Sequence, residues 1–233
     1  MKLLENKWAF VTGSSRGVGQ QIALGLAQRK CNLILHGRKT ENTAETARLL
    51  QAYDIRTHVV SGDLESAASV DAIIQAVQAG PGPVDILYNN AAFQNPWKPI
   101  WEIGPEDWQR SFQVNLFAMV AFCNAFAPGM KVRGYGRIIN LTSGIKDIPQ
   151  LAPYSVSKAA VDKYTRDLAA ELQGSNVLVN ALDPGWLKTD MGGPNAEGEV
   201  ESVLPGALVP ALLDDHGPSG RFYAAQDYKV LER

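Results

Sequence analysis

The chain has 233 residues, of which 45% are hydrophobic and 20% are charged, and its formal net charge is -2. This length and composition suit a single soluble α/β domain, and the charge gives no electrostatic basis for binding nucleic acid or an anionic membrane. No run approaches the roughly 18 apolar residues that cross a bilayer. An acidic residue interrupts the short apolar start, so we expect no signal peptide and a cytoplasmic protein.

The cysteines and histidines indicate neither a disulfide nor a metal site. Cys31 and Cys123 lie far apart in apolar surroundings, which predicts buried free thiols in a reducing compartment. His36, His58 and His216 have no metal-ligand spacing with one another or with a cysteine. We therefore predict that the chain binds no metal.

The first predicted element is a buried strand over 8–12, which leads into a glycine-rich turn and then a helix over 20–29. The free N–H groups and partial positive charge of a helix N-terminus favour a phosphate, and glycines let the backbone approach a pyrophosphate closely. A plain surface loop is the alternative. We predict a dinucleotide site with contacts from the residues of the turn, namely Gly13, Ser15, Arg16, Gly17, Val18 and Gly19.

The second predicted strand, 32–36, ends at a basic turn. NAD-binding units usually carry an acidic residue here for the ribose 2′-hydroxyl, but this chain has Gly37 followed by Arg38 and Lys39. With Arg16 these side chains suit a 2′-phosphate, because guanidinium groups pair with phosphate through charge-assisted hydrogen bonds. A solvated basic turn is the alternative. We predict NADP(H) as the cofactor, in preference to NAD(H).

Strands and helices continue to alternate, which predicts a doubly wound parallel sheet with right-handed crossovers. Ligands of such a sheet bind beyond the carboxyl ends of the strands. Asp63 and Leu64 follow one end, and Asn90 and Ala91 follow another, so we expect all four at the cofactor. Asp63 can equally cap the next helix. The elements of this part are helices over 41–53 and 66–78 and strands over 55–60 and 84–88.

A loop over 93–103 carries Phe93, Trp97 and Trp101. It forms either a wall of a substrate pocket or a surface loop folded on its own aromatic residues. Pro105 then begins a helix, since proline is favoured in the first turn. Asn115 lies within the apolar face of this helix and needs hydrogen-bond partners there.

Tyr154 and Lys158 are the strongest candidates for chemistry. They lie four residues apart at the start of a predicted helix over 154–172, so the phenol and the ammonium share one face. An adjacent ammonium lowers the pKa of a phenol from about 10, which makes proton transfer feasible. Ser143 ends a predicted strand, 137–142, where its hydroxyl can hydrogen-bond a substrate oxygen. For the pair alone, an ordinary surface tyrosine and lysine are the alternative.

The last predicted strands cover 177–182 and 220–224, with a short helix from about Glu199 between them. The segment 189–195 is rich in turn-forming residues and follows a strand end that faces the cofactor. It is predicted to form a lid, with a plain surface loop as the alternative.

Six motifs occur in the order of the short-chain dehydrogenase/reductase family, and the chain resembles that family from about residue 7 to residue 224. The resemblance implies a Rossmann-type fold with seven parallel strands. It also implies a homodimer or homotetramer built on the helices of Asn115 and Tyr154. The motifs are Thr12 to Gly19, Asn89 to Ala91, Asn115, Ser143, Tyr154 with Lys158, and Asp183 to Gly185.

The resemblance implies a catalytic tetrad of Asn115, Ser143, Tyr154 and Lys158. In the family the tyrosine is the general acid or base and the serine holds the carbonyl. The lysine lowers the pKa of the tyrosine and binds the nicotinamide ribose, while the asparagine supports a water relay. Cofactor contacts are also implied for Tyr154 and Lys158 themselves and for Pro184, Gly185 and Thr189.

Some features depart from the family pattern. Ala92 stands where the family usually has glycine, and the loop between Ser143 and Tyr154 is shorter than usual. The segment from Pro184 onward looks most like the carbonyl-reductase-like and C-factor-like members.

These observations together predict an NADP(H)-dependent oxidoreductase that transfers a hydride between the nicotinamide and a carbonyl or secondary alcohol of a small organic substrate. Phe93, Trp186 and Met191 are the predicted substrate contacts. We expect a single domain, 1–233, with a dinucleotide-binding half over about 7–92 and a catalytic half over about 93–233. A non-catalytic NADP-binding regulatory protein and a lyase or epimerase are the alternatives.

Overall fold

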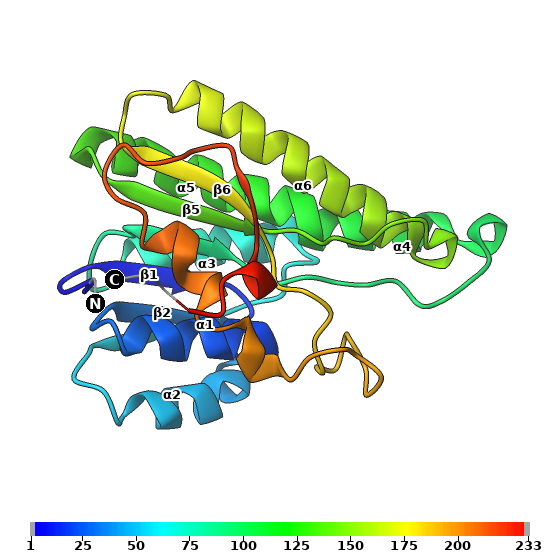
Figure 1. The fold of residues 1–233 in the computed structure, drawn as a ribbon, viewed down its shortest axis with the longest axis horizontal. Coiled ribbons are helices and arrows are strands. Elements are labelled where there is room, and N and C mark those ends of the chain that lie inside the picture. Colours follow the sequence, from blue (N-terminus) through cyan, green and yellow to red (C-terminus); the bar gives the residue numbers. More distant parts are fainter. Residues whose placement is uncertain (1–2, 231–233) are drawn as a thin grey trace.

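Seven parallel strands form one sheet in the order β3-β2-β1-β4-β5-β6-β7. The structure is a computed structural model that describes residues 3–230 (Figure 1). The predicted doubly wound α/β fold is confirmed. The strands are β1 (Trp8–Val11), β2 (Asn32–Gly37), β3 (Thr57–Ser61), β4 (Ile86–Asn89), β5 (Gly136–Leu141), β6 (Val177–Asp183) and β7 (Phe222–Ala224).

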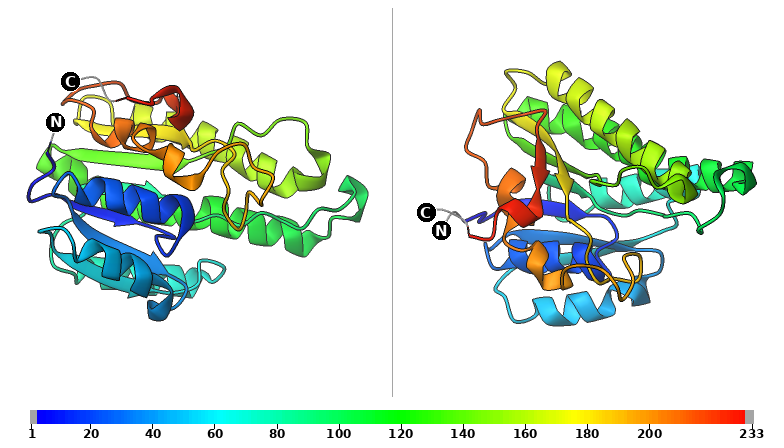
Figure 2. Two further views of the ribbon diagram at one scale, coloured as in Figure 1. Left: turned by 60° about the horizontal axis from the view of Figure 1, so that its bottom comes forward. Right: turned by 45° about the vertical axis from the view of Figure 1, so that its right-hand side comes forward.

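Helices cover both faces of the sheet (Figure 2). On one face lie α3, α5 and α6, and on the other lie α1 and α2 with short 3-10 helices near the C-terminus. The α-helices are α1 (Gly17–Ala27), α2 (Ala44–Leu50), α3 (Ala67–Gln78), α4 (Pro105–Phe112), α5 (Ala118–Arg133) and α6 (Ala152–Glu171). The 3-10 helices are η1 (Thr40–Thr43), η2 (Ile100–Glu102), η4 (Pro149–Leu151), η5 (Val200–Val203), η6 (Gly206–Ala211) and η7 (Ala225–Asp227), and η3 (Gln113–Phe117) is a π-helix.

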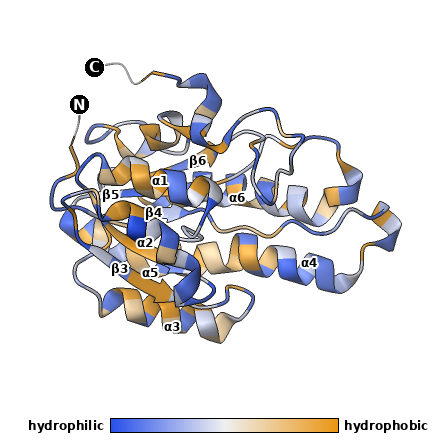
Figure 3. Ribbon diagram, turned by 90° about the horizontal axis from the view of Figure 1, so that it is seen from below, coloured by the Kyte–Doolittle hydropathy of each residue, from blue (hydrophilic) through white to orange (hydrophobic). Residues whose placement is uncertain are grey.

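Successive side chains along each strand point to opposite faces of the sheet, so the core has two layers. Phe10 packs with α3 and α5, whereas its neighbours Ala9 and Val11 pack with α1 on the opposite face. Both faces are therefore apolar, as the central strands of a parallel sheet require. Figure 3 shows these hydrophobic strands between helices that carry both hydrophilic and hydrophobic residues. Cys31 and Cys123 are buried free thiols in these layers, as predicted.

Two branches of the chain leave β1 in opposite directions across the sheet, because β1 pairs with both β2 and β4. The loops that follow β1 and β4 therefore run apart and leave a crevice between them, which is where ligands bind in open α/β sheets. The strand ends themselves stay adjacent, because the Oγ1 of Thr12 accepts hydrogen bonds from the N–H groups of Asn90 and Ala91, both at 3.0 Å.

The structure corrects several predicted boundaries. Helix α1 begins at Gly17 and so includes part of the predicted turn. The predicted helix over 41–53 forms as a 3-10 helix, η1, followed by a shorter α2 that ends at Leu50. The hydroxyl of Ser66, and not Asp63, caps α3, because its Oγ accepts the N–H of Ser69 at 3.3 Å.

Within residues 3–230, one helical run, Pro105–Arg133, is long and apolar enough by length and composition to span a membrane. No such run was predicted from consecutive apolar residues, and the join of α4, η3 and α5 into one continuous helix accounts for the difference. Its apolar residues include Phe122, Cys123 and Met130, which are buried against the sheet. Packing in the core therefore explains the hydrophobic character of this helix.

Candidate functional site

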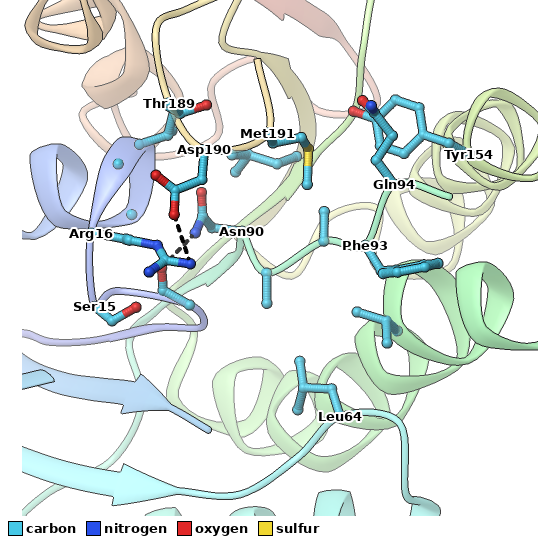
Figure 4. Close-up of a pocket in the computed structure, with 18 of the residues that line it drawn as sticks. Ser15, Arg16, Leu64, Asn90, Phe93, Gln94, Tyr154, Thr189, Asp190 and Met191 are labelled. Atoms are coloured by element: carbon cyan, nitrogen blue, oxygen red, sulfur yellow. Dashed lines mark hydrogen bonds and ion pairs between the residues drawn. The ribbon is translucent and has the colours of Figure 1, made fainter. Parts of the chain in front are cut away.

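A cavity of about 850 Å³ lies at the carboxyl ends of the strands (Figure 4). Residues from distant parts of the sequence line it, including the glycine turn, the ends of β2, β3 and β4, helix α6 and the segment after β6. Most of the predicted site residues meet here: Gly13, Ser15, Arg16, Gly17, Val18, Gly19, Arg38, Asp63, Leu64, Asn90, Ala91, Phe93, Tyr154, Lys158, Pro184, Thr189 and Met191.

Four predicted site residues do not line this cavity. Asn115 and Ser143 lie just behind it and contact residues that do, as described below. Gly185 supports the turn after β6 with a φ of 86°. Trp186 is 54% exposed, and its Nε1 donates a hydrogen bond to the carbonyl oxygen of Gly192. The structure therefore does not support the predicted substrate contact of Trp186.

The glycine turn fits a bound pyrophosphate. Gly13 and Gly17 have φ values of 63° and 60°, which side chains disfavour. A Cβ at Gly19 would lie 2.3 Å from the carbonyl oxygen of Gly13, so only glycine allows this close fold. Arg16 stands at the N-cap of α1 and makes no side-chain capping hydrogen bond. The first N–H groups of α1 thus stay available for an anion.

His36 was not predicted as part of the site, yet it supports the glycine turn from below. Its Nδ1 accepts the N–H of Gly13 at 3.1 Å, and its Nε2 lies 3.1 Å from the carbonyl oxygen of Gly62. The proton therefore belongs on Nε2. Burial lowers the pKa of His36 to about 4, so the ring is neutral and ties the ends of three strands together. A histidine at the end of an otherwise apolar strand is the sequence signal for this role.

Two of the three basic residues of the predicted phosphate pocket lie at the cavity. Arg16 and Arg38 line the cavity, whereas Lys39 does not. Arg16 also forms an ion pair of 2.9 Å with Asp190, which belongs to the segment after β6 (Figure 4). Both side chains of this pair are about 70% exposed, at 68% and 72%. The glycine turn and the predicted lid are thus joined across the mouth of the cavity.

Asp63 and Leu64, which were predicted to contact the cofactor, line the cavity just after β3. The Oδ1 of Asp63 accepts the N–H of Glu65 at 3.0 Å, which fixes the turn after β3. Arg110 from α4 also lines the cavity here, where it pairs with Glu65 at 2.5 Å and lies 4.0 Å above the ring of Phe93. Phe93 is therefore held as a wall of the cavity, and its contact with Arg110 was not predicted.

Tyr154 and Lys158 share one face of α6, as predicted, and both are buried. The Nζ of Lys158 lies 5.7 Å from the centroid of the Tyr154 ring and donates a hydrogen bond of 2.7 Å to the carbonyl oxygen of Leu141. Burial lowers the pKa of Lys158 to about 8, and the charges of Asp162 and Asp183 oppose that change. The ammonium therefore remains the main form at neutral pH.

The predicted lowering of the Tyr154 pKa is not what the structure shows. Burial raises the pKa of Tyr154, a hydrogen bond from Ser143 lowers it less strongly, and the charge of Asp183 adds to the rise. Tyr154 is 9% exposed, so loss of solvation outweighs the effect of the hydrogen bond from Ser143. Tyr154 therefore keeps its proton at neutral pH, which suits a proton donor.

Ser143 follows β5 and lies beside the phenol of Tyr154. Its Oγ also accepts the N–H of Ile145 at 3.2 Å, which fixes the direction of the side chain. Gly144 follows, and a Cβ at this position would lie 2.7 Å from the Oδ2 of Asp183. The absence of a side chain at Gly144 therefore leaves room for Asp183, whose charge raises the pKa of both Tyr154 and Lys158.

Asn115 lies in the π-helix η3, and its hydrogen bonds satisfy the predicted need for partners. Its Oδ1 accepts the N–H of Phe93 at 2.7 Å, and its Nδ2 donates to the carbonyl oxygen of Phe93 and to the Oγ of Ser157, both at 2.9 Å. Ser157 in turn donates to the carbonyl oxygen of Tyr154 at 2.7 Å. Asn115 thus joins the wall of the cavity to the helix that carries the tyrosine.

The loop from Phe93 onward forms one end of the cavity, with Gln94, Asn95, Pro96 and Trp97 among the lining residues. Figure 4 shows Gln94 and Tyr154 at the end opposite Ser15 and Arg16. Trp101 is 84% exposed and does not line the cavity. The wall therefore consists of the first part of the loop, and Gln94 and Asn95 belong to it although they were not predicted.

The segment after β6 covers the glycine turn. Thr189 approaches Gly17, since its Cγ2 would lie 3.4 Å from a Cβ at that glycine. The Oγ1 of Thr189 accepts the N–H of Gly192 at 3.0 Å, which closes a tight turn. Met191 projects from this turn into the cavity (Figure 4). The segment thus lies over the glycine turn, at the place where the lid was predicted.

The chain matches the family model described as short chain dehydrogenase over residues 7–200. It is 30% identical to the D-beta-hydroxybutyrate dehydrogenase of Cupriavidus necator, across 98% of this chain and 90% of that protein. Its fold is similar to the crystal structure of a 3-oxoacyl (acyl-carrier-protein) reductase from Agrobacterium tumefaciens with NADP bound, at 29% identity, a TM-score of 0.85 and coverage of 95% and 93%. It is also similar to a gluconate 5-dehydrogenase from Burkholderia cenocepacia in complex with NADP and tartrate, at 28% identity, a TM-score of 0.84 and coverage of 95% and 94%.

Proposed function

The chain belongs to the short chain dehydrogenase family, and from this premise we propose that it is an NADP(H)-dependent reductase of small carbonyl compounds. As a member of this family it is an NAD(P)-dependent oxidoreductase that acts on CH–OH or C=O groups. The observation that carries the proposal is a single cavity that contains both the uncapped start of α1 and the pair Tyr154 and Lys158. A cofactor on the glycine turn and a substrate beside the phenol would share this space.

Two observations support NADP(H) as the cofactor. Gly37 ends β2 in place of a carboxylate, and Arg16 and Arg38 line the cavity beside it. A 2′-phosphate would pair with these guanidinium groups, whereas a carboxylate would repel it. The similar reductase from Agrobacterium tumefaciens and the similar dehydrogenase from Burkholderia cenocepacia both have NADP bound.

We propose the following roles for the predicted tetrad. Bound nicotinamide would supply or accept the hydride. Tyr154 gives its proton to the substrate oxygen as the carbonyl is reduced, and the hydroxyl of Ser143 hydrogen-bonds the same oxygen. Lys158 holds a positive charge beside the phenol and contacts the nicotinamide ribose. Asn115 fixes the position of the cavity wall relative to α6 through its hydrogen bonds to Phe93 and Ser157, and it supports a water relay.

The raised pKa of Tyr154 suits the proposed role of its phenol as a proton donor. The phenol holds the proton that reduction of a carbonyl requires. In the reverse reaction, oxidation of an alcohol, the phenolate of the same residue accepts the proton.

We also propose a homodimer or homotetramer built on the continuous helix of α4, η3 and α5, which carries Asn115, and on α6, which carries Tyr154. Phe117 at the end of η3 and Val156 on α6 are 55% and 45% exposed, which is high for large apolar side chains. Light scattering that gives the mass of a single chain would exclude this assembly. We further propose a cytoplasmic location and one domain, in which 7–92 serves the dinucleotide and 93–233 serves catalysis.

The proposed function is tested by NADPH oxidation with a panel of aldehydes, ketones, diketones, quinones and keto-sugars, using Tyr154→Phe as the control. We expect turnover of at least one carbonyl class and a loss of about 100-fold or more in the variant, as for removal of a general acid. Tight NADPH binding without turnover of any compound would favour the non-catalytic alternative. Turnover without net oxidation of the cofactor would favour a lyase or epimerase.

A further inference from the structure

Asn95 is a buried polar residue within an exposed loop. It is 1% exposed, whereas Trp97 two residues later is 64% exposed. A buried amide without partners costs about 1–3 kcal/mol, so such residues are normally held by hydrogen bonds. Asn95 has three: its Oδ1 accepts one, and its Nδ2 donates two. This loop residue is thus fixed as firmly as one in the core.

The acceptor bond of Asn95 ends at Tyr154. Its Oδ1 accepts the backbone N–H of Tyr154 at 3.3 Å, across 59 residues of sequence. Helix α6 has Leu151 at its N-cap, which makes no side-chain capping hydrogen bond. The N–H of Ala152 binds the carbonyl oxygen of Pro149, and Pro153 has no N–H. Asn95 therefore supplies from a distance the cap that helix α6 lacks in its own sequence.

The donor bonds of Asn95 close the loop onto the turn before α6. Its Nδ2 donates to the carbonyl oxygen of Gln150 at 3.0 Å and to that of Pro96 at 2.9 Å. Gln94, Pro96 and Trp97 all line the cavity. One side chain thus joins the wall that faces a substrate to the first turn of the helix that carries the phenol.

We propose that Asn95 is a positioning residue for Tyr154, and that it couples the substrate-facing loop to the place of the phenol. This inference rests on the proposed function, in which Tyr154 donates the proton. The Oδ1 of Asn95 fixes the position of Tyr154, because it accepts the backbone N–H of that residue. The Nδ2 of Asn95 fixes the position of the loop. We therefore expect loss of the acceptor to change kcat and loss of the donors to change KM.

Two variants separate these halves. Asn95→Leu has a similar size but removes both, whereas Asn95→Asp keeps an acceptor for the Tyr154 N–H and loses the donors. We expect Asn95→Leu to lower kcat roughly 10- to 100-fold, since a displacement of about 1 Å at a reacting group has an effect of this size. We expect Asn95→Asp to keep kcat within about threefold of the wild type and to raise KM for the carbonyl substrate, because the carboxylate still caps α6.

The matched control is Asn32→Leu. Asn32 is also a buried asparagine, and its Oδ1 accepts the N–H of Arg56 at 2.8 Å at the opposite end of the sheet. This variant should lose stability without a change in kcat per folded molecule. Circular dichroism and NADPH binding by calorimetry give the folded fraction of each variant.

The outcomes separate the inference from the function on which it rests. Loss of kcat in Asn95→Leu with recovery in Asn95→Asp supports the inference. If Tyr154→Phe is inactive, two results overturn the inference. One is equal kcat values for Asn95→Leu and Asn95→Asp, and the other is a loss of kcat in Asn32→Leu as large as that in Asn95→Leu. An active Tyr154→Phe instead overturns the proposed role of the tyrosine, and the inference is then rejected with it.

Discussion

Lys158 and Asp162 decide the charge beside the proposed proton donor. Lys158 is 3% exposed, and Asp162 is the first of the two carboxylates whose charge raises its pKa against the effect of burial. The result is a pKa of about 8 for Lys158. Its ammonium is present below this value and is lost as the pH rises through it.

We therefore expect kcat/KM for carbonyl reduction to fall above a pH of about 8, the pKa of Lys158. Asp162→Asn removes a charge that raises the pKa of Lys158, so the fall should begin at a lower pH. The pH profile of kcat/KM for both proteins checks this. Asp167→Asn is a matched control, because Asp167 is an exposed carboxylate on the same helix, paired with Lys163. A profile that is the same for Asp162→Asn and the wild type would contradict the prediction.

At the scale of elements, the glycine turn and the end of β2 form the proposed phosphate pocket. Arg38 lines the cavity and Lys39 does not, although they are neighbours in sequence. Truncation of the two residues to alanine should therefore have unequal effects. We expect Arg38→Ala to lose roughly 10- to 100-fold of the preference for NADPH over NADH, the size of a charge-assisted hydrogen bond. Lys39→Ala should keep most of it.

The measurement is the ratio of kcat/KM for NADPH to that for NADH in each variant. Equal losses in Arg38→Ala and Lys39→Ala would mean that general positive charge sets the preference. No loss in Arg38→Ala would move the phosphate pocket elsewhere.

The strands, most helices and the glycine turn were predictable because local patterns encode them. Buried strands are short apolar runs, and helix α4 begins at Pro105, where proline is favoured. Long-range contacts encode the parts that were not predicted. The π-helix forms around Asn115, whose partner is Phe93, and the cap of α6 comes from Asn95. No window of sequence contains both members of either pair.

Two parts of the candidate site show the same limit. The spacing of Tyr154 and Lys158 gives their common face, but the sign of the Tyr154 pKa change depends on burial, which the spacing does not contain. Trp186 follows a strand end that faces the cavity, yet its indole turns to Gly192. Position at a strand end predicts that a residue is near the site, and it leaves the direction of the side chain undetermined.

At the scale of the whole molecule, His36 makes folding stability depend on pH. The folded state has a pKa of about 4 for His36, against 6.5 as the ordinary value. The unfolded chain therefore binds a proton between these values that the folded chain does not, and stability falls as the pH is lowered through this window. We expect a loss of about 2 kcal/mol between pH 7 and pH 5 from this residue.

Urea unfolding of the cofactor-free protein at both pH values checks this. His36→Gln should be less stable at pH 7 but should lose less stability on acidification. His58→Gln on β3 is the matched control and should keep the pH dependence of the wild type. An unchanged pH dependence in His36→Gln would assign the acid sensitivity to other groups.

The ion pair between Arg16 and Asp190 has a consequence for ionic strength. Both side chains are mostly exposed, and such a pair contributes only about 0–1 kcal/mol, less as salt is added. An arriving phosphate competes with Asp190 for the same guanidinium. Added salt therefore weakens both the attraction between the cofactor phosphate and Arg16 and the ion pair between Arg16 and Asp190, which the phosphate must displace. Cofactor affinity should depend on salt less steeply than the two arginines alone would suggest.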